Sequence, residues 1–361
     1  MGGTAVVVGA GVGGLATAIG LRRAGWQVSV RERREGPERY GTAFGIHPTA
    51  QSALERLGVG EAFHARAVPY RGARIRTPAG AVLASLPLER IERKAGRPEV
   101  LISRPYLIDA LLAELERFGD VPLAFGDRAE TAEDVDKLLA GHDLVVGADG
   151  LRSTVRTARF GEHSTPRHVG TVAWIGVADL ESGVHGETWG KGRFFGMTPI
   201  EPGRTNWYAT VPAAGPDSAD GPDSADEVRA YFDGWHDPIP RILRETDPAT
   251  WIRYEMRHLY PALPAFVTEG RIALVGDAAH AMTPNLGQGA CTALLDAEAL
   301  SRAIAGRTGQ GAAGLGAALR AYDAERRRSA QRVALGSRTL HRFMSAERTR
   351  LRDSLVRALP A

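Results

Sequence analysis

Cysteine, lysine and long apolar runs are all scarce in this sequence of 361 residues. The single cysteine, Cys291, excludes a disulfide framework, and a chain of this length buries enough apolar surface to fold without disulfide or metal cross-links. The apolar run at residues 5–21 is broken by glycines and has no positively charged region before it, so we expect neither a signal peptide nor a membrane anchor. These absences predict a cytoplasmic protein with no metal site and no integral membrane association.

Charge is nearly balanced over the chain but not at its end. The sequence has 45 basic and 42 acidic side chains, and all but three of the basic ones are arginine. Residues 321–361 contain ten arginines and four acidic residues. We expect a solvated amphipathic helix there and no nucleic-acid partner, because the run lacks the pattern of stacking aromatics that base-binding surfaces use.

Glycine, in contrast, is in excess. It accounts for 43 of 361 residues, about 12%, where about 7% is usual. Neither a collagen period nor a low-complexity run explains this surplus. We therefore expect many glycines to serve backbone geometry at particular sites.

The first glycine motif lies between a predicted strand and a predicted helix. Residues 5–8 form a short apolar run, helical spacing extends over 13–24, and residues 26–31 are predicted to be a second strand that closes at Glu32. Three glycines after the first strand have the G-x-G-x-x-G spacing of a dinucleotide-binding loop: Gly9, Gly11 and Gly14. The N-terminus of such a helix binds pyrophosphate, and a carboxylate at Glu32 can accept hydrogen bonds from ribose hydroxyls.

Two other glycine-containing segments are interpreted as loops. Residues 309–314 match the same glycine pattern, but they follow a predicted helix rather than a strand and have no acidic partner downstream. Residues 215–226 contain GPDSAD twice in tandem and no apolar side chain larger than alanine. Neither segment is expected to bind a nucleotide.

Two further motifs place acidic residues at strand ends. Residues 143–147 are predicted to be a buried strand ahead of Asp149, and residues 271–275 a second one ahead of Asp277. The sequence PNLGQGA follows, at the start of a helix predicted over 290–305. An aspartate at a strand end can hold a polyol such as the ribitol of a flavin, and free N–H groups at a helix start can stabilise negative charge on a flavin ring.

Between these motifs the pattern changes to that of an antiparallel sheet. Residues 170–211 alternate with period two, and residues 74–77 and 81–86, on either side of Pro-Ala-Gly, are predicted to form a hairpin. Helices are expected over 50–57 and 105–117. The chain is thus predicted to leave a nucleotide-type parallel sheet, to build an antiparallel sheet and then to return.

The chain resembles the class A flavoprotein monooxygenases, the aromatic hydroxylase family typified by para-hydroxybenzoate hydroxylase. The resemblance rests on the order and spacing of GAGVGG, the Glu-Arg pair at 32–33, GADGLRSTVR and GDAAHAMTPNLGQGA. The resemblance covers essentially the whole chain. It implies an α/β fold in which a Rossmann-like FAD-binding domain is interleaved with an antiparallel-sheet substrate domain and followed by a C-terminal helix. The implied divisions are residues 1–70, 101–160 and 265–325 for FAD, 71–100 and 161–264 for substrate, and 326–361 for the helical end.

The resemblance also implies the residues that bind FAD. Glu32 would bind the adenosine ribose beside Arg33, and Arg104 would bind the pyrophosphate region. Asp149 is linked to both FAD and NAD(P)H binding in the family, and Asp277 would hold the ribitol. The isoalloxazine ring would be lined by Pro284, Gly287, Gln288, Gly289 and Ala290.

The reaction implied by the resemblance uses NAD(P)H and O₂ to hydroxylate a small aromatic or heteroaromatic substrate through a flavin C4a-hydroperoxide. Because FAD carries this chemistry, no catalytic side chain is assigned, and His47 is the best candidate for a polar group near the flavin. The antiparallel sheet would form the roof of the substrate pocket. We expect Phe195 and Met197 on one strand and Trp207 on its partner to line it, although plain core packing would suit these three side chains equally well.

Several alternatives remain at this point. Epoxidation and Baeyer–Villiger insertion are possible on the same fold, and a non-catalytic dinucleotide-fold protein is a third option. Halogenation is disfavoured, because the W-x-W-x-I-P motif and a suitable lysine are missing. Both a monomer and a homodimer are compatible with the sequence. Cys291 is interpreted as a buried small residue and His280 as a structural histidine, whereas Arg156 suits an ion pair and a cofactor contact equally well.

Overall fold

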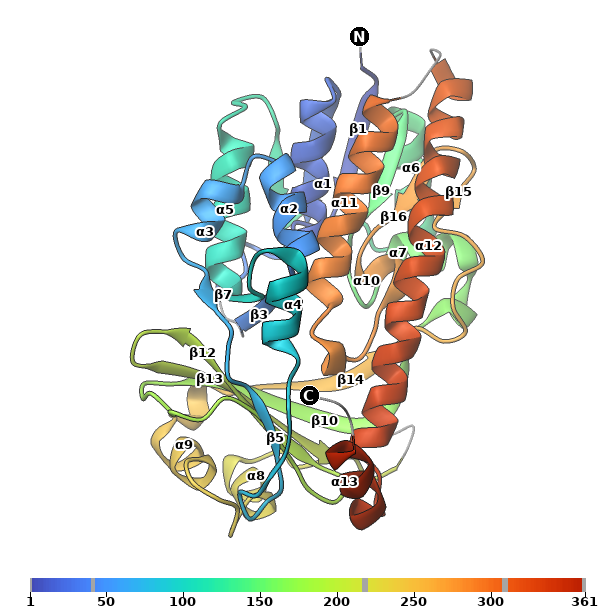
Figure 1. Ribbon diagram of the computed structural model, residues 1–361. Coiled ribbons are helices and arrows are strands. Elements are labelled where there is room, and N and C mark those ends of the chain that lie inside the picture. Colours follow the sequence, from blue (N-terminus) through green and yellow to red (C-terminus); the bar gives the residue numbers. More distant parts are fainter. Residues whose placement is uncertain (1, 40–42, 216–219, 307–310, 359–361) are drawn as a thin grey trace.

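The computed structural model describes residues 2–39, 43–215, 220–306 and 311–358, and it has two large sheets stacked end to end (Figure 1). The first sheet contains the N-terminus and is parallel except at one edge. Its six strands, in spatial order, are β15 (Val267–Thr268), β16 (Ile272–Leu274), β9 (Leu144–Gly147), β1 (Thr4–Val8), β2 (Gln27–Glu32) and β8 (Leu123–Phe125). The strands β9, β1 and β16 are fully or almost fully buried, which explains their continuous apolar sequences.

Helices cover the parallel sheet. The first crossover helix, α1 (Val12–Arg23), packs between α5 (Arg104–Glu116) and α11 (Gly289–Ala305), and α6 (Ala132–Gly141) packs on α7 (Thr154–Phe160). Residues far apart in the sequence therefore share one core, in which β1, α1 and α11 contribute side chains that are almost completely buried. A small sheet lies below these helices: β3 (Ala43–Ile46), β7 (Val100–Ser103) and β4 (Val68–Pro69).

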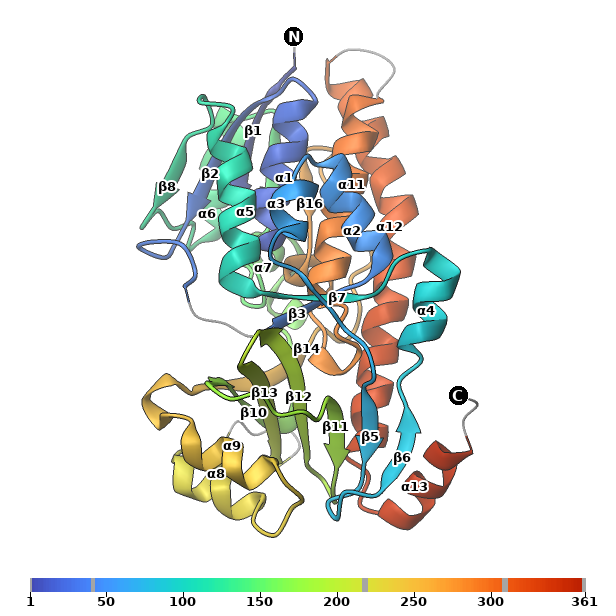
Figure 2. The same ribbon diagram turned by 60° about the vertical axis from the view of Figure 1, so that its left-hand side comes forward.

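The second large sheet is mainly antiparallel, as predicted for residues 170–211. Its spatial order is β14 (Ile252–His258), β10 (Arg167–Ala178), β13 (Arg204–Pro212), β12 (Phe194–Glu201), β11 (Gly186–Trp189), β5 (Arg74–Arg76) and β6 (Val82–Ser85). The predicted hairpin is the antiparallel pair β5–β6. The outer face of this sheet is covered by α8 (Ala225–Tyr231) and α9 (Ile239–Glu245), and its inner face is turned toward the parallel-sheet half (Figure 2).

The remaining elements connect the two halves. Short helices lie in the linking segments: α2 (Pro48–Arg56), α3 (Gly60–His64), α4 (Leu88–Ala95), α10 (Asp277–His280) and the 3-10 turns Glu162–Ser164, Pro248–Thr250 and Pro284–Leu286. The C-terminal part consists of α12 (Gly311–Met344) and α13 (Thr349–Arg357). In Figure 1, α12 runs along both halves of the molecule and α13 lies beside the antiparallel sheet.

One local prediction is wrong. The second glycine-pattern match was expected to be a loop, yet residues 311–314 form the first turn of α12, while 309 and 310 lie outside the described residues. The reason is tertiary packing: Leu315, Ala318 and Leu319 enter the main core and hold this glycine-rich turn as helix. Within the described residues, none of the helices has the length and apolarity needed to cross a membrane.

Candidate active site

The glycine loop at the end of β1 has the geometry of a phosphate-binding turn. Gly9 has φ +110°, and a side chain at Gly14 would collide with the carbonyl oxygen of Gly9. A Cβ at Gly11, by contrast, would meet nothing within 4 Å. The first and third glycines are therefore required for the turn and for helix–strand packing, whereas the second leaves open space in front of the N-terminus of α1, where a pyrophosphate fits.

Glu32 lies at the end of β2, beside this loop. It is 5% exposed, and its carboxylate accepts hydrogen bonds from the backbone N–H of Ala10 (2.8 Å) and of Arg34 (2.9 Å). These bonds hold the carboxylate against the glycine loop, at the edge where a ribose would follow the pyrophosphate. Arg33, next to it, is exposed and forms no ion pair with the described residues.

Arg104, the first residue of α5, is oriented by two neighbours. Its guanidinium pairs with the buried carboxylate of Glu38 (Nη2–Oε2, 2.9 Å) and lies 5.2 Å from the ring centroid of Phe44. One third of its side chain, 33%, stays exposed. Such an arginine is fixed in place and still offers N–H donors to a phosphate.

Arg156 joins the two aspartate motifs structurally. Its guanidinium is buried and donates hydrogen bonds to the backbone carbonyls of Leu151 (2.8 Å), Asp277 (3.3 Å) and Ala278 (3.2 Å). Desolvation lowers the pKa of Arg156, against the opposing charges of Asp149 and Asp277. Of the two roles considered from the sequence, the contacts support a structural one, in which Arg156 ties the strand end after β9 to the strand end after β16.

Asp149, which follows β9, has one carboxylate oxygen that is hydrogen-bonded and one that has no partner. Its Oδ2 accepts a hydrogen bond from the backbone N–H of Val155 (3.1 Å), and its Oδ1 is buried without a partner in the described structure. Burial raises the pKa of this carboxyl, partly offset by hydrogen bonds from Ser153 and Val155. A buried oxygen with no partner is costly, so Oδ1 is suited to accept a hydrogen bond from a ligand.

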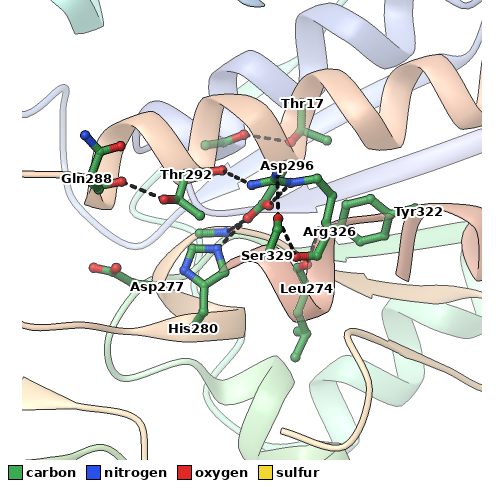
Figure 3. Close-up of polar contacts among 12 residues, drawn as sticks. Thr17, Leu274, Asp277, His280, Gln288, Thr292, Asp296, Tyr322, Arg326 and Ser329 are labelled. Atoms are coloured by element: carbon green, nitrogen blue, oxygen red, sulfur yellow. Dashed lines mark hydrogen bonds and ion pairs between the residues drawn. The ribbon is translucent and has the colours of Figure 1, made fainter. Parts of the chain in front are cut away.

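Asp277 and His280, both on α10, point in different directions (Figure 3). The exposed carboxylate of Asp277 makes no hydrogen bond within the described chain, whereas His280 is buried and its Nε2 lies 2.5 Å from Oδ2 of Asp296 on α11. Oδ1 of Asp296 accepts a hydrogen bond from Nε of Arg326 on α12 (2.8 Å). His280 thus belongs to a buried three-residue link between α10, α11 and α12, as expected of a structural histidine, and Asp277 is free for a ligand.

Asp296 is the centre of that link. Desolvation by itself would raise its pKa, but the charge of His280 and the guanidinium of Arg326 outweigh it, so the pKa of Asp296 is lowered. The same carboxylate accepts a hydrogen bond from the backbone N–H of Gly276 (3.0 Å), directly before Asp277. The link therefore fixes the backbone that presents Asp277.

The loop before α11 supplies backbone N–H groups. After the 3-10 turn Pro284–Leu286, Gly287 adopts φ +63° and Gln288 precedes the first helical residue, Gly289. The first N–H groups of a helix have no partner within it, and at Gly289 and Ala290 they lie at the positive end of a 17-residue helix. Pro284 and Gly287 are exposed, and Gln288, Gly289 and Ala290 are half-buried, so this loop can face a planar ring.

Cys291, in the first turn of α11, links His47 to the start of that helix. The Sγ of Cys291 accepts a hydrogen bond from the backbone N–H of His47 (3.3 Å) and donates one to the carbonyl of Gly45 (3.2 Å). The imidazole of His47 is half-buried and faces Oγ1 of Thr49 (3.3 Å), and burial lowers its pKa. Burial also raises the pKa of Cys291 to about 12, in agreement with a structural rather than a nucleophilic thiol.

The three side chains predicted to line the substrate pocket lie elsewhere, and this expectation is corrected. Phe195, Met197 and Trp207 are at most 1% exposed. They pack in the core between the antiparallel sheet and α8 and α9, where Phe195 stacks on Trp207 with 5.7 Å between ring centroids. They therefore face away from the FAD-binding half and stabilise the outer layer.

The opposite, inner face carries polar residues that sequence reasoning missed. On β11 and β13, Glu187 accepts hydrogen bonds from the Tyr208 hydroxyl (2.8 Å) and from Nε1 of Trp189 (2.7 Å). On the same face, Oδ1 of Asn206 accepts a hydrogen bond from the backbone N–H of Ala43, the first residue of β3. The alternation of residues 186–212 shows which side chains share a sheet face. Glu187 is an acidic residue within that pattern, and this was the sequence signal that could have identified the polar face.

Comparison with known proteins agrees with this geometry. A family model described as an FAD binding domain matches residues 3–337. The aurachin C monooxygenase/isomerase of Stigmatella aurantiaca is 37% identical over 347 residues, which cover 92% of this chain and 88% of the relative. The 2-heptyl-3-hydroxy-4(1H)-quinolone synthase of Pseudomonas aeruginosa is 33% identical, over 83% of this chain and 80% of its own. The solved structure of Klebsiella pneumoniae HpxO complexed with FAD and uric acid has a TM-score of 0.83 at 26% identity, covering 98% of this chain and 91% of that one.

The residues present fit FAD. Open space at Gly11, the unpartnered Oδ1 of Asp149, the free carboxylate of Asp277 and the helix start at Gly289 are the features such a cofactor needs. The family match and the related structures confirm the predicted α/β fold, FAD as the cofactor and an oxidoreductase of the monooxygenase type. A non-catalytic dinucleotide-fold protein is therefore not supported. The chain belongs to the FAD-binding-domain family of class A flavin monooxygenases.

Proposed function

We propose that this chain hydroxylates a small heteroaromatic substrate, using NAD(P)H and O₂, as a cytoplasmic monomer or homodimer. The observation that carries the proposal is that β3 contacts both the start of α11 and the polar inner face of the antiparallel sheet. Cys291 of α11 donates a hydrogen bond to the carbonyl of Gly45, and the N–H of Ala43 donates one to Asn206. Relatives named for quinolones and a neighbour that contains uric acid support a heteroaromatic ring.

Bound FAD supplies the redox chemistry that activates oxygen, and the protein supplies position and exclusion of water. The residues proposed for its adenosine diphosphate part are Glu32, Arg33 and Arg104, with the glycine loop at the pyrophosphate. Asp149 and Asp277 would hold the ribitol side. The N–H groups at Gly289 and Ala290 would stabilise negative charge on the flavin ring, and His47 would approach that ring from β3.

The inner sheet face would hold the substrate ring across from the flavin. Trp189, Tyr208 and Glu187 are linked by hydrogen bonds, so their positions are fixed before a ligand arrives. A prepositioned wall orients the carbon to be oxygenated, which is a main contribution of protein to such a reaction.

The test is a substrate screen with purified, FAD-loaded protein. We expect a yellow protein that oxidises NADH or NADPH faster when a suitable phenol or quinolone is present, and a product heavier by one oxygen atom in mass spectrometry. Protein that stays colourless after addition of FAD would contradict the proposal. Stoichiometric H₂O₂ without an oxygenated product would indicate an oxidase instead. An epoxide or a ring-expanded product would select one of the alternative oxygenations.

A further inference from the structure

Two carboxylates near the inner face of the antiparallel sheet have no cationic partner among the described residues. They are Glu99, directly before β7, and Glu187 on β11. Neither forms an ion pair with an arginine, lysine or histidine of the described chain, although this sequence has 45 basic side chains. The buried acids Glu38, Asp296 and Glu298, in contrast, do have such partners. Because arginine is abundant in this protein, a carboxylate that pairs with none of these side chains is a candidate for ligand binding.

Glu99 lies beside the residues proposed to meet the flavin ring. A Cβ at Gly45 would be 2.9 Å from Oε1 of Glu99, and the carbonyl of Gly45 accepts the hydrogen bond from Cys291 in the first turn of α11. The Glu99 carboxylate has no hydrogen-bond partner in the described structure, and burial raises its pKa. It is therefore an acceptor with its hydrogen-bonding capacity unused.

Tyr70 connects Glu99 with Glu187. The backbone N–H of Tyr70 donates to the carbonyl of Glu99 (2.9 Å), and its buried ring lies close enough to both carboxylates that their charges add to the effect of burial in raising its pKa. Beyond Glu187 come Tyr208 and then Tyr254 on β14, whose pKa burial raises to about 12. We call these five residues the acid–tyrosine wall: Tyr70, Glu99, Glu187, Tyr208 and Tyr254. Hydrogen bonds join Tyr208 to Glu187 and the backbone of Tyr70 to that of Glu99, and the strand register puts Tyr254 on the same sheet face as Tyr208.

The wall has a definite chemical preference. A carboxylate offers about four acceptor positions, and Glu187 uses two of them on Trp189 and Tyr208, whereas Glu99 uses none. Acceptors of this kind match a ring that carries N–H or O–H donors. Burial raises the pKa of both carboxyl groups, so the wall favours uncharged partners. A negatively charged ring would lose hydration here and find no arginine or lysine among these five residues to pair with, which is unfavourable in a partly desolvated site.

We propose that the acid–tyrosine wall binds an uncharged heteroaromatic ring, that Glu99 accepts a hydrogen bond from a ring N–H or O–H, and that the wall excludes aromatic carboxylates. This inference rests on the proposed function, because it assigns the substrate to the inner face across from FAD. It makes Glu99 a substrate-binding residue and Glu187 a specificity-determining residue held in place by Trp189 and Tyr208.

The test compares two rings that differ by one carboxylate, 4-hydroxyquinoline and 4-hydroxyquinoline-2-carboxylate. Their binding to FAD-loaded protein is measured by perturbation of the flavin absorbance and by calorimetry. We expect the neutral ring to bind at least ~100-fold more tightly than its carboxylate, because burying a charge without a cationic partner is costly. Equal or tighter binding of the carboxylate, or no binding of either ring at millimolar concentration, would overturn the inference.

Variants of Glu99 sharpen the test. Glu99→Gln should weaken binding of 4-hydroxyquinoline by ~10-fold or more, strengthen binding of the carboxylate and leave FAD affinity unchanged. Glu99→Asp keeps the charge with a shorter reach and should fall between the two proteins. The control Glu61→Gln removes an exposed charge on α3 and should behave as the parent does. If Glu99→Gln binds both rings as Glu61→Gln does, the role of Glu99 is refuted.

The two proposals fail in different ways. Protein that binds the neutral ring selectively but never oxidises NAD(P)H would contradict the monooxygenase function and leave the wall intact. Protein that turns over aromatic carboxylates with a correctly oxygenated product would confirm the function and refute the wall.

Discussion

The glycines of the loop between β1 and α1 meet different requirements. Gly14 has no space for a side chain, because the carbonyl of Gly9 lies directly against it. Gly11 has extended backbone (φ −78°, ψ −177°), which any residue can adopt, and open space in front of it. The first constraint belongs to the fold and the second to the ligand.

This difference gives a matched pair of substitutions. Gly14→Ala should prevent stable folding or lower the free energy of unfolding by several kcal/mol, because backbone would have to move. Gly11→Ala should leave the stability of the FAD-free protein within about 0.5 kcal/mol and raise the Kd for FAD by at least ~10-fold, since its methyl group enters the pyrophosphate space. Urea unfolding and FAD titration measure the two effects. Unchanged FAD affinity in Gly11→Ala would refute this placement of the cofactor.

The local geometry of the motif residues could be predicted from the sequence, whereas the environment of the sheet residues could not. The glycine loop, Glu32 and Asp277 act through local backbone geometry, which short sequence patterns encode. Phe195 and Met197 were assigned correctly to one sheet face, but the sequence left open whether they line a pocket or pack in a core. Alternation identifies which side chains share a face, and only the packing of α8 and α9 decides which face is turned outward.

At the scale of elements, α12 connects the two halves of the molecule. Its first half packs on the parallel-sheet half, where the Tyr322 hydroxyl donates to the carbonyl of Leu274 (2.7 Å) and Asp323 accepts from the backbone N–H of Phe266 (2.6 Å). Its second half reaches the antiparallel sheet, where Nε2 of His341 lies 3.2 Å from Oγ1 of Thr171 on β10. The sequence predicted an arginine-rich helix here without indicating what it would contact.

Two buried histidines make the second contact sensitive to pH. Desolvation and nearby arginines lower the pKa of His341 on α12 and of His258 on β14 to about 4, from an ordinary value near 6.5. Each therefore contributes stability above pH ~6.5 that is lost as the pH falls toward 4. We expect the free energy of unfolding to fall between pH 7 and pH 5 by on the order of 2 kcal/mol per histidine.

Equilibrium urea unfolding at several pH values tests this expectation. His341→Gln keeps a polar side chain that does not titrate, so it should remove the contribution of one histidine, on the order of 2 kcal/mol. His163→Gln, at an exposed position, serves as the control. A His341→Gln protein with the full pH dependence of the parent would show that the histidine is not held neutral at this contact.

At the scale of the whole molecule, the order of the motifs was sufficient to predict that the chain leaves the parallel sheet and returns to it. Each return is marked by an apolar strand followed by an acidic residue, as at Asp149 and Asp277, and parallel strands bring those ends to one edge. The coupling of the two halves by α12 was not predictable, because it depends on contacts between residues more than 150 positions apart, such as His341 and Thr171.

Tryptophan positions allow this coupling to be measured. Of the six tryptophans, only Trp26 lies in the parallel-sheet half, and the other five belong to the antiparallel half: Trp174, Trp189, Trp207, Trp235 and Trp251. The FAD site proposed above lies in the opposite half, yet we expect FAD to raise the midpoint of the tryptophan-detected unfolding transition. The gain should approach ~2.7 kcal/mol at 100 times the Kd. A tryptophan transition that does not move with FAD would mean that the halves unfold independently.

The burial of Cys291 has a practical consequence for experiments on this protein. Its thiol is fully buried, bonded on both sides and raised in pKa, so reagents that modify thiolates at neutral pH have no target in the folded chain. A cysteine introduced on the surface of α8 or α12 would then carry a fluorophore or spin label alone, with no need to remove the native one. Distances between such labels would report how the two halves move when cofactor and substrate bind.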